Sequence, residues 1–315
     1  MTLEEFTIST VKSLFHITNE RIGEAVGFFV YDTLKVLLLL FFMIFLVGTL
    51  RTYLPTYKVK KYLSGKKEGV GNFFASVFGA ITPFCSCSSI PIFFSMLEAG
   101  VPLGVGFSFL ITSPLVNEYV AVLMISVFGL KVALYYIAAG MIIGIIGGII
   151  LGRMRLEKYL VKDILKQDKT KKEKVYKYFS ERLRFGLSEA TDVLKKTWIY
   201  AVIGIGIAAI IHGYVPESFF SEFVNKGGIF AVPIATIIGV PLYASCASLI
   251  PIAAAFVSKG IPLGTALAFL MSTAALSFPE AVMLRRAMKL KLILIFFGIV
   301  ALSIMIIGYL FNWII

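Results

Sequence analysis

Long apolar blocks are the feature that most constrains this chain. Stretches close to the roughly 20 residues that cross a bilayer recur from Val30 to the C-terminus. The mean hydropathy is +0.90 and only 15% of the residues are charged, which is too apolar for an ordinary soluble domain. Nothing between the blocks is large enough for a separate enzymatic domain. The sequence therefore predicts an all-α polytopic membrane protein that works within the bilayer.

The positive charge gathers in the short connections between apolar blocks. The formal net charge is +12, and the basic stretches 51–69 and 153–196 are predicted to be cytoplasmic by the positive-inside rule. We read this charge as a topology signal with membrane lipids as neighbours, and we expect no nucleic acid partner. The N-terminal MTLEEFTIST lacks the charged region and cleavage site of a secretory signal, so we treat residues 1–28 as part of the mature protein.

An internal repeat divides the chain. At an offset of 160 residues, PIFFSMLEAGVPLGVGFSFLITS (91–113) aligns with PIAAAFVSKGIPLGTALAFLMST (251–273), and several glycines and prolines match. Two homologous halves are typical of secondary transporters. The predicted organisation has an N-terminal segment, which we interpret as an interfacial helix, then a first transmembrane repeat, a basic linker and a second transmembrane repeat: 1–29, 30–152, 153–195 and 196–315.

Two arrangements of the apolar blocks remain open. Each half contains four blocks, so eight plain spans are the simplest reading. However, eight crossings place one basic connection on the wrong side of the membrane. The conflict disappears if blocks 70–98 and 229–258 enter the bilayer and return to their own side. The halves are then inverted, with six spans and two re-entrant hairpins, which is the arrangement that the charges favour.

Two polar interruptions occupy matching places in the halves: ITPFCSCSSIPIFF (81–94) and VPLYASCASLIP (240–251). Proline breaks helical hydrogen bonding, and the freed backbone groups are tolerated at membrane depth only inside protein or beside a wet cavity. All three cysteines of the chain lie in these interruptions. The predicted substrate-binding residues are Cys85, Cys87, Cys246, Ser86, Ser88, Ser245 and Ser248.

Thiolates suit soft species such as trivalent arsenic, trivalent antimony or monovalent copper. The alternative is that small Cys and Ser side chains merely let helices approach closely.

Further residues are predicted to break helices or to couple transport to an ion. The predicted helix-breaking prolines are Pro83, Pro91, Pro114, Pro241, Pro251 and Pro279. The segments TSPLVNE and STAALSFPE, aligned with a two-residue shift, carry Asn117, Glu118 and Glu280. Intramembrane carboxylates are costly, so these residues are candidates for coupling or gating. An interfacial salt bridge to Arg285 or Arg286 is the alternative for Glu280.

Other motifs are sparse. The linker carries no phosphate-binding motif, and we expect no cofactor, no metal site and no enzymatic activity. The stretch GMIIGIIGGIILG (140–152) has small residues at four-residue spacing, which indicates tight helix packing within the chain or across a homo-oligomer.

The motif TPFCSCSSIP, followed by GVPLG and TSP, resembles the signature of the YraQ/ArsP permease family. The resemblance covers both repeats. It implies an inner-membrane permease, with an expected eight spans, whose cysteine motif maps to Cys85 and Cys87. The best-understood branch of that family exports trivalent organoarsenicals such as methylarsenite.

These observations predict a secondary transporter of a small-molecule substrate that is soft or thiol-reactive, with efflux of a trivalent organoarsenical as the specific hypothesis. Two other classes remain: a membrane thiol/disulfide oxidoreductase that uses Cys85 and Cys87, and a passive channel.

Overall fold

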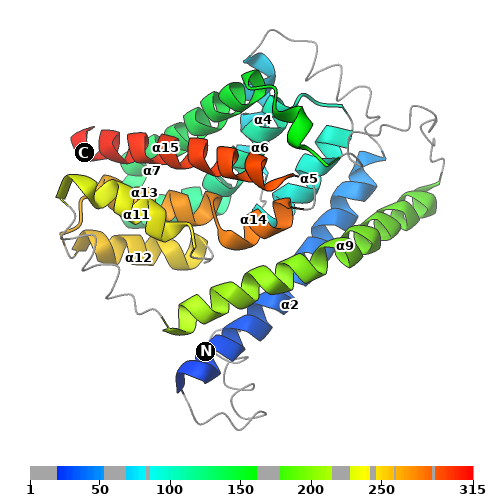
Figure 1. Ribbon diagram of the computed structural model, residues 1–315, viewed down its shortest axis with the longest axis horizontal. Helices are drawn as coiled ribbons and strands as arrows, with labels where there is room; N and C mark the ends of the chain where they lie inside the picture. Colours follow the sequence, from blue (N-terminus) through cyan, green and yellow to red (C-terminus); the bar gives the residue numbers. More distant parts are fainter. Residues whose placement is uncertain are drawn as a thin grey trace.

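The computed structural model describes residues 20–52, 69–82, 86–98, 100–161, 178–214, 228–241, 246–258, 260–285 and 288–314. Over these ranges the chain is helical, with one isolated antiparallel bridge between Leu160 and Met288 (Figure 1). The helices in chain order are α2 (Glu20–Arg51), α4 (Val70–Ile81), α5 (Ser86–Glu98), α6 (Leu103–Leu115), α7 (Glu118–Arg153), η1 (Leu156–Tyr159), α9 (Phe179–Tyr214), η2 (Gly228–Phe230), α11 (Ala231–Gly239), α12 (Cys246–Ser258), α13 (Leu263–Ala275), α14 (Phe278–Leu284) and α15 (Leu290–Ile314).

Several helical segments are suited to a bilayer. Val120–Arg153, Leu263–Leu284 and Leu290–Ile314 are long and apolar enough to cross it. Apolar side chains such as Leu294, Leu302 and Ile306 of α15 are more than half exposed, as expected for a surface that faces lipid. The prediction of an all-α membrane protein is confirmed.

Helices α2 and α9 form a long antiparallel pair at one side of the molecule (Figure 1). Gly186 of α9 packs against Thr49 near the end of α2, while Gly206 lies against Phe29 near its start. Arg182 donates a hydrogen bond from Nη1 to the Thr52 carbonyl oxygen at 3.0 Å. Both helices extend beyond the predicted boundaries, because residues 20–29 already belong to α2 and residues 179–195 to α9. Residues 1–19 lie outside the described part.

The three short helices that follow run in alternating directions. Asn72 at the start of α4 reaches Gly104 at the start of α6, so these two helices run parallel. Ser89 of α5 bonds to Ser113 near the end of α6, and the Phe93 ring lies 5.3 Å from that of Phe107 nearer its start. Helix α5 is therefore antiparallel to both α4 and α6, and the chain reverses direction between residues 82 and 86.

Helix α7 bends sharply at Gly129, whose φ of 83° lies in a region that glycine adopts without steric cost. Its longer part, residues 130–153, returns along α6. Gly148 and Gly152 lie against Gly104, where the absence of side chains lets the two backbones approach closely.

The second half has the same order of elements. Shifted by 160 residues, the bounds of α5 and α6 coincide with those of α12 and α13. The residues before α6 and α13, Pro102 and Pro262, have matching backbone angles (φ −55°, ψ 139° and φ −56°, ψ 139°). The backbone contact of Gly104 with Gly148 has its counterpart in Gly264 with Gly308. The bend at Gly129 corresponds to the connection between α14 and α15.

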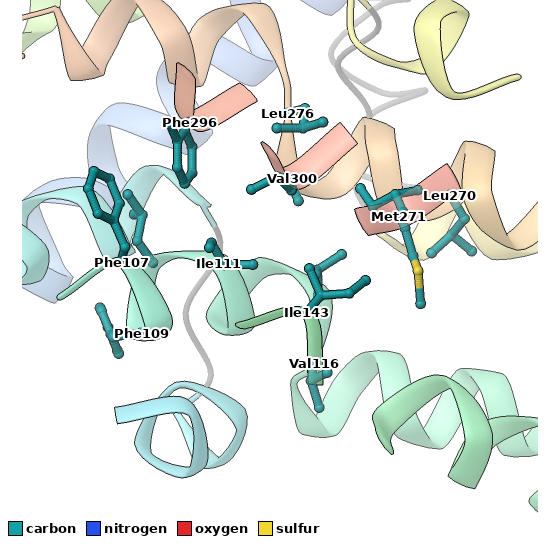
Figure 2. Close-up of a cluster of buried hydrophobic side chains, with 14 of the residues drawn as sticks. Phe107, Phe109, Ile111, Val116, Ile143, Leu270, Met271, Leu276, Phe296 and Val300 are labelled. Carbon is teal, nitrogen blue, oxygen red and sulfur yellow. The ribbon is translucent and has the colours of Figure 1, made fainter. Parts of the chain in front are cut away.

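The halves meet across an apolar core formed by α6, α7, α13 and α15. Figure 2 shows Phe107 facing Phe296 in this core, with Ile111, Leu276 and Val300 beside them. The Phe107 and Phe296 rings stack with centroids 5.2 Å apart. This contact joins the halves through apolar surface, and the two rings form no hydrogen bond with each other.

Candidate functional site

The reversal between α4 and α5 lies level with the middle of a spanning helix. A Cβ placed on Gly79, near the end of α4, would lie 3.2 Å from the amide nitrogen of Ser113 near the end of α6. The end of α6 lies in turn beside Gly140, which packs against Val116. Gly140 is close to the midpoint of residues 130–153, the long part of α7. Helices α4 and α6 therefore both end halfway along that part.

The second half repeats this geometry. Gly239 at the end of α11 packs against Ser272 and Thr273 near the end of α13. A Cβ on Gly308 of α15 would lie 3.0 Å from the Cβ of Ala268, two turns before α13 ends. Helix α13 therefore ends near the middle of α15, where Figure 2 shows Leu276 close to Val300. In each half, two neighbouring short helices therefore end level with the middle of the longer helix beside them: α4 and α6 in the first half, and α11 and α13 in the second.

The predicted substrate-binding residues fall at these interruptions or just outside the described ranges. Helix α5 begins with Ser86, Cys87 and Ser88, and α12 begins with Cys246 and contains Ser248 in its first turn. Cys85, Pro83 and Ser245 lie outside the described residues. The described members of the set therefore lie in the first turns of α5 and α12, at the helix ends that are level with the middle of the spanning helices.

Two of the predicted breaks are corrected by the structure. Pro91 and Pro251 lie inside α5 and α12, which continue to Glu98 and Ser258. The preceding helices α4 and α11 end at Ile81 and Gly239, before these prolines. A proline within a helix lacks the N–H that would bond to the carbonyl four residues before it. These prolines therefore deprive the carbonyl oxygens of Cys87 and Ala247 of their helical donors, in the first turn of each hairpin helix.

The remaining prolines lie at helix ends. Pro114 is the penultimate residue of α6, and Pro241 follows the end of α11. Pro279 lies in the first turn of α14, where its missing N–H costs no helical hydrogen bond. Pro279 and Pro114 therefore flank the interruptions between α6 and α7 and between α13 and α14.

The structure adds buried polar groups that the sequence reasoning missed. Asn72 donates from Nδ2 to the Gly104 carbonyl oxygen at 3.1 Å and to Ser108 Oγ at 2.8 Å. Ser89 Oγ lies 2.7 Å from Ser113 Oγ. Ser76 Oγ and Thr112 Oγ1 are buried without a hydrogen-bond partner in the described part of the chain. The signal in the sequence was a lone Asn, and single hydroxyls, within apolar blocks.

The two candidate carboxylates differ in environment. Asn117 caps α7 by accepting a hydrogen bond from the Val120 amide at 2.8 Å, and the Glu118 side chain beside it is exposed. Glu280 in the first turn of α14 is 1% exposed. Ser277 is the N-cap residue of α14, although its side chain makes no capping hydrogen bond, and it matches Asn117 without any shift; the two-residue shift that aligns the glutamates is therefore wrong. Glu280 matches Val120, and Glu118 matches Phe278.

Similarity to known proteins agrees with this architecture. The family described as "Predicted permease" (ArsP_1) matches residues 21–313. A Streptococcus mutans protein whose name describes a subunit of a two-component membrane permease complex is 30% identical over 271 residues, covering 83% of this chain and 86% of its own length.

Two proteins named UPF0718 are also similar: MJ0584 of Methanocaldococcus jannaschii, 22% identical with 94% and 96% coverage, and YcgR of Bacillus subtilis, 24% identical with 79% and 85% coverage. No solved structure is significantly similar to the chain. Because the family match extends over nearly the whole sequence and the interrupted helices carry the motif that resembles it, the chain belongs to the ArsP_1 family of predicted permeases.

Proposed function

We propose that this permease is a secondary transporter of a small, soft or thiol-reactive solute, with efflux of a trivalent organoarsenical as the specific hypothesis. The observation that carries the proposal is that α4 and α11 end at Ile81 and Gly239, halfway along spanning helices, and that α5 and α12 begin only a few residues later, at Ser86 and Cys246. Irregular backbone at such depth is stable only inside protein or beside a wet cavity, and in transporters it lines the solute site.

The re-entrant arrangement is supported by helix length and direction. Helices α4, α5 and α6 have 12, 13 and 13 residues, which at about 1.5 Å per residue is well short of the roughly 30 Å hydrocarbon core. Helix α4 starts beside Gly104, and α5 returns to the same end of α6. Block 70–98 thus enters and leaves on one side.

A contact far from the hairpins supports the same topology. Leu160, just after α7, pairs with Met288, just before α15. Blocks 197–213, 229–258 and 262–284 separate these two residues. Three full crossings place them on opposite sides of the membrane, whereas two crossings and a re-entrant hairpin place them on the same side. The contact therefore favours six spans with two hairpins over eight plain spans.

Inversion of the halves is supported by the α2 and α9 pair. The 160-residue shift carries α2 onto residues 180–211, which lie within α9. These corresponding helices run antiparallel. If the halves are repeats, they are related by inversion, which is the symmetry that lets one site open alternately to the two sides.

The chemistry of the proposed site rests on sulfur and backbone oxygen. Cys87 combines a thiol with a carbonyl that Pro91 deprives of its helical donor. With methylarsenite, each thiol forms an S–As bond while one As–O bond breaks, and the hydroxyl leaves with the thiol proton as water. The exchange is reversible and involves no change in oxidation state, as transport requires. Neutral alcohol side chains of the serines would solvate the hydroxyl that remains after the first exchange and leaves as water in the second.

We assign coupling to Glu280 rather than to Glu118. Glu280 is buried in the short helix that follows the second interruption, while Glu118 is exposed at the matching bend of the first half. A buried carboxylate at this depth is costly unless it exchanges a proton or pairs with a cation.

The direct test is uptake into inside-out vesicles or proteoliposomes that contain the Cys85→Ser/Cys87→Ser variant. We expect methylarsenite transport to fall about tenfold or more, since the S–As bond is lost. Ser258→Ala, an exposed hydroxyl that bonds only within its own helix turn, is the matched control and should transport normally.

Unchanged transport by the double cysteine variant would remove the thiol role. A thiol-independent flux that never saturates and ignores the proton gradient would support the channel instead. A reversible Cys85–Cys87 disulfide that passes electrons to an acceptor would support the oxidoreductase.

A further inference from the structure

A cluster of cations surrounds one tyrosine where the two halves meet at a helix end. Lys158 Nζ lies 5.2 Å from the centroid of the Tyr159 ring, and Lys291 Nζ lies 5.3 Å from it. The Lys289 amide donates to the Tyr159 carbonyl oxygen at 2.9 Å. We call Lys158, Tyr159, Lys289 and Lys291 the Tyr159 cluster. Its members come from two segments about 130 residues apart in the sequence.

The backbone holds the cluster in place. Leu156, Leu160 and Met288 are buried beneath it, at 4%, 3% and 0% exposure. Arg155 adopts a left-handed φ of 48°, which turns the chain from α7 into η1. The lysine side chains are exposed above this buried base. The fold thus holds two exposed ammonium groups beside one ring, and an anion bound there would be attracted by both.

The cluster lies at the boundary between apolar helix and water. Helix α7 ends at Arg153 and α15 begins at Leu290, so the cluster marks the end of two candidate spans that pack together. Below it, Ile150, Met154, Leu290 and Leu294 expose 41%, 46%, 53% and 61% of their surface. A phosphate at the cluster would therefore have acyl chains along this apolar strip.

We propose that the Tyr159 cluster binds the headgroup phosphate of an anionic phospholipid and thereby fastens the end of the first half to the start of α15. Lys158 and Lys291 donate charge-assisted hydrogen bonds to the phosphate. The neighbouring ammonium groups lower the pKa of Tyr159, first through a hydrogen bond with Lys291, which makes its hydroxyl a stronger donor to an anion. Glu157, the one carboxylate in residues 153–161, is exposed and belongs to the same short turn.

A lipid bound there would favour the orientation in which η1 and α15 touch, because the bridge between Leu160 and Met288 joins them at the cluster. This inference depends on the membrane location and not on the identity of the solute.

Native mass spectrometry of the full chain, released from nanodiscs of phosphatidylglycerol and phosphatidylcholine mixed equally, tests the proposal. We expect phosphatidylglycerol to be retained at least about fivefold over phosphatidylcholine. The Lys158→Gln/Lys291→Gln variant should lose that preference, and Tyr159→Phe should weaken it. Lys131→Gln, an exposed lysine just after the Gly129 bend and at the far end of residues 130–153 from the cluster, should keep it.

Equal retention of the two lipids by the wild type, or equal loss in Lys131→Gln and the double variant, overturns the proposal. Competition by inorganic phosphate alone also overturns the lipid assignment, because it indicates a free-anion site. If the double variant fails to fold, Tyr159→Phe, which keeps the ring and the bridge, decides between these outcomes.

Discussion

Phe107 of α6 and Phe296 of α15 stack with ring planes 20° apart, and this pair is a direct contact between the two halves of the permease. Both rings are fully buried. If the halves rock against each other during transport, this apolar contact is where one slides on the other. An apolar stack allows such movement, because it loses no hydrogen bond when the rings shift.

Truncating Phe107 or Phe296 to alanine should weaken the packing between the two halves. We expect Phe107→Ala and Phe296→Ala each to lower the free energy of unfolding by about 3–5 kcal/mol. The double variant should show a coupling energy of about 0.5–1.5 kcal/mol, since the stacking is lost only once. Thermal unfolding followed by fluorescence-detected size exclusion measures this. Trp313→Ala, at a side chain that is 85% exposed, is the control.

Adding a methyl group at Gly148 should separate α6 from α7. A Cβ there would lie 2.6 Å from the Gly104 carbonyl oxygen, so a backbone must move. We expect Gly148→Ala to lower the free energy of unfolding by about 1–3 kcal/mol. Gly298→Ala, with nothing within 4 Å of its Cβ, should be neutral or slightly stabilising. Equal effects at the two glycines would contradict the close approach.

Asn72 should stabilise the packing of α4 on α6, where the first hairpin begins. Replacing it with Leu removes the buried donor to Gly104 and Ser108 and leaves only the 3.3 Å bond from Ser108 Oγ to the Gly104 carbonyl oxygen. We expect a loss of about 1–3 kcal/mol in the free energy of unfolding. Ser126→Ala, which removes an exposed hydroxyl bonded only to its own helix, serves as the reference. A stability equal to that of the reference variant would show that the Asn72 hydrogen bonds are unimportant.

Transport should depend on Glu280 far more than on Glu118. We expect Glu280→Gln to reduce proton-driven transport by about tenfold or more, because the buried carboxylate can no longer exchange a proton. Glu118→Gln should remain near the wild-type rate, since its side chain is exposed. Vesicle flux measured with and without a proton gradient checks both variants. Full gradient dependence in Glu280→Gln would remove the coupling role.

Labelling should place residues 157 and 289 on one side of the membrane. In a background with the three native cysteines replaced by serine, we expect Glu157→Cys and Lys289→Cys to react with an impermeant maleimide from the same face. Lys131→Cys should react from the opposite face. All three positions are exposed. Labelling of 157 and 289 from opposite faces would restore the eight-span arrangement.

The sequence predicted the features that depend on local composition and spacing. Block length and apolarity indicated a helical membrane protein, and the proline-rich segments indicated where helices stop. The glycines of 140–152 predicted close packing, and Gly148 against Gly104 is such a contact. Pro91 and Pro251 were assigned wrongly as breaks, because a proline near a helix start costs one hydrogen bond rather than the helix. The alignment of Glu118 with Glu280 is wrong, because it matches residue types, whereas the helix starts at Asn117 and Ser277 match without the two-residue shift.

Other features follow only from the tertiary structure. Charge counts left two topologies open, whereas the direction of α5 against α6 and the contact of Leu160 with Met288 favour one of them. Similarly, two glutamates in similar motifs differ in burial because they occupy different positions in their helices: Glu280 matches the buried Val120, and Glu118 matches the exposed Phe278. Apolar spacing can specify that a helix is buried, but which distant segment covers it depends on how the whole chain packs, and that information is not local.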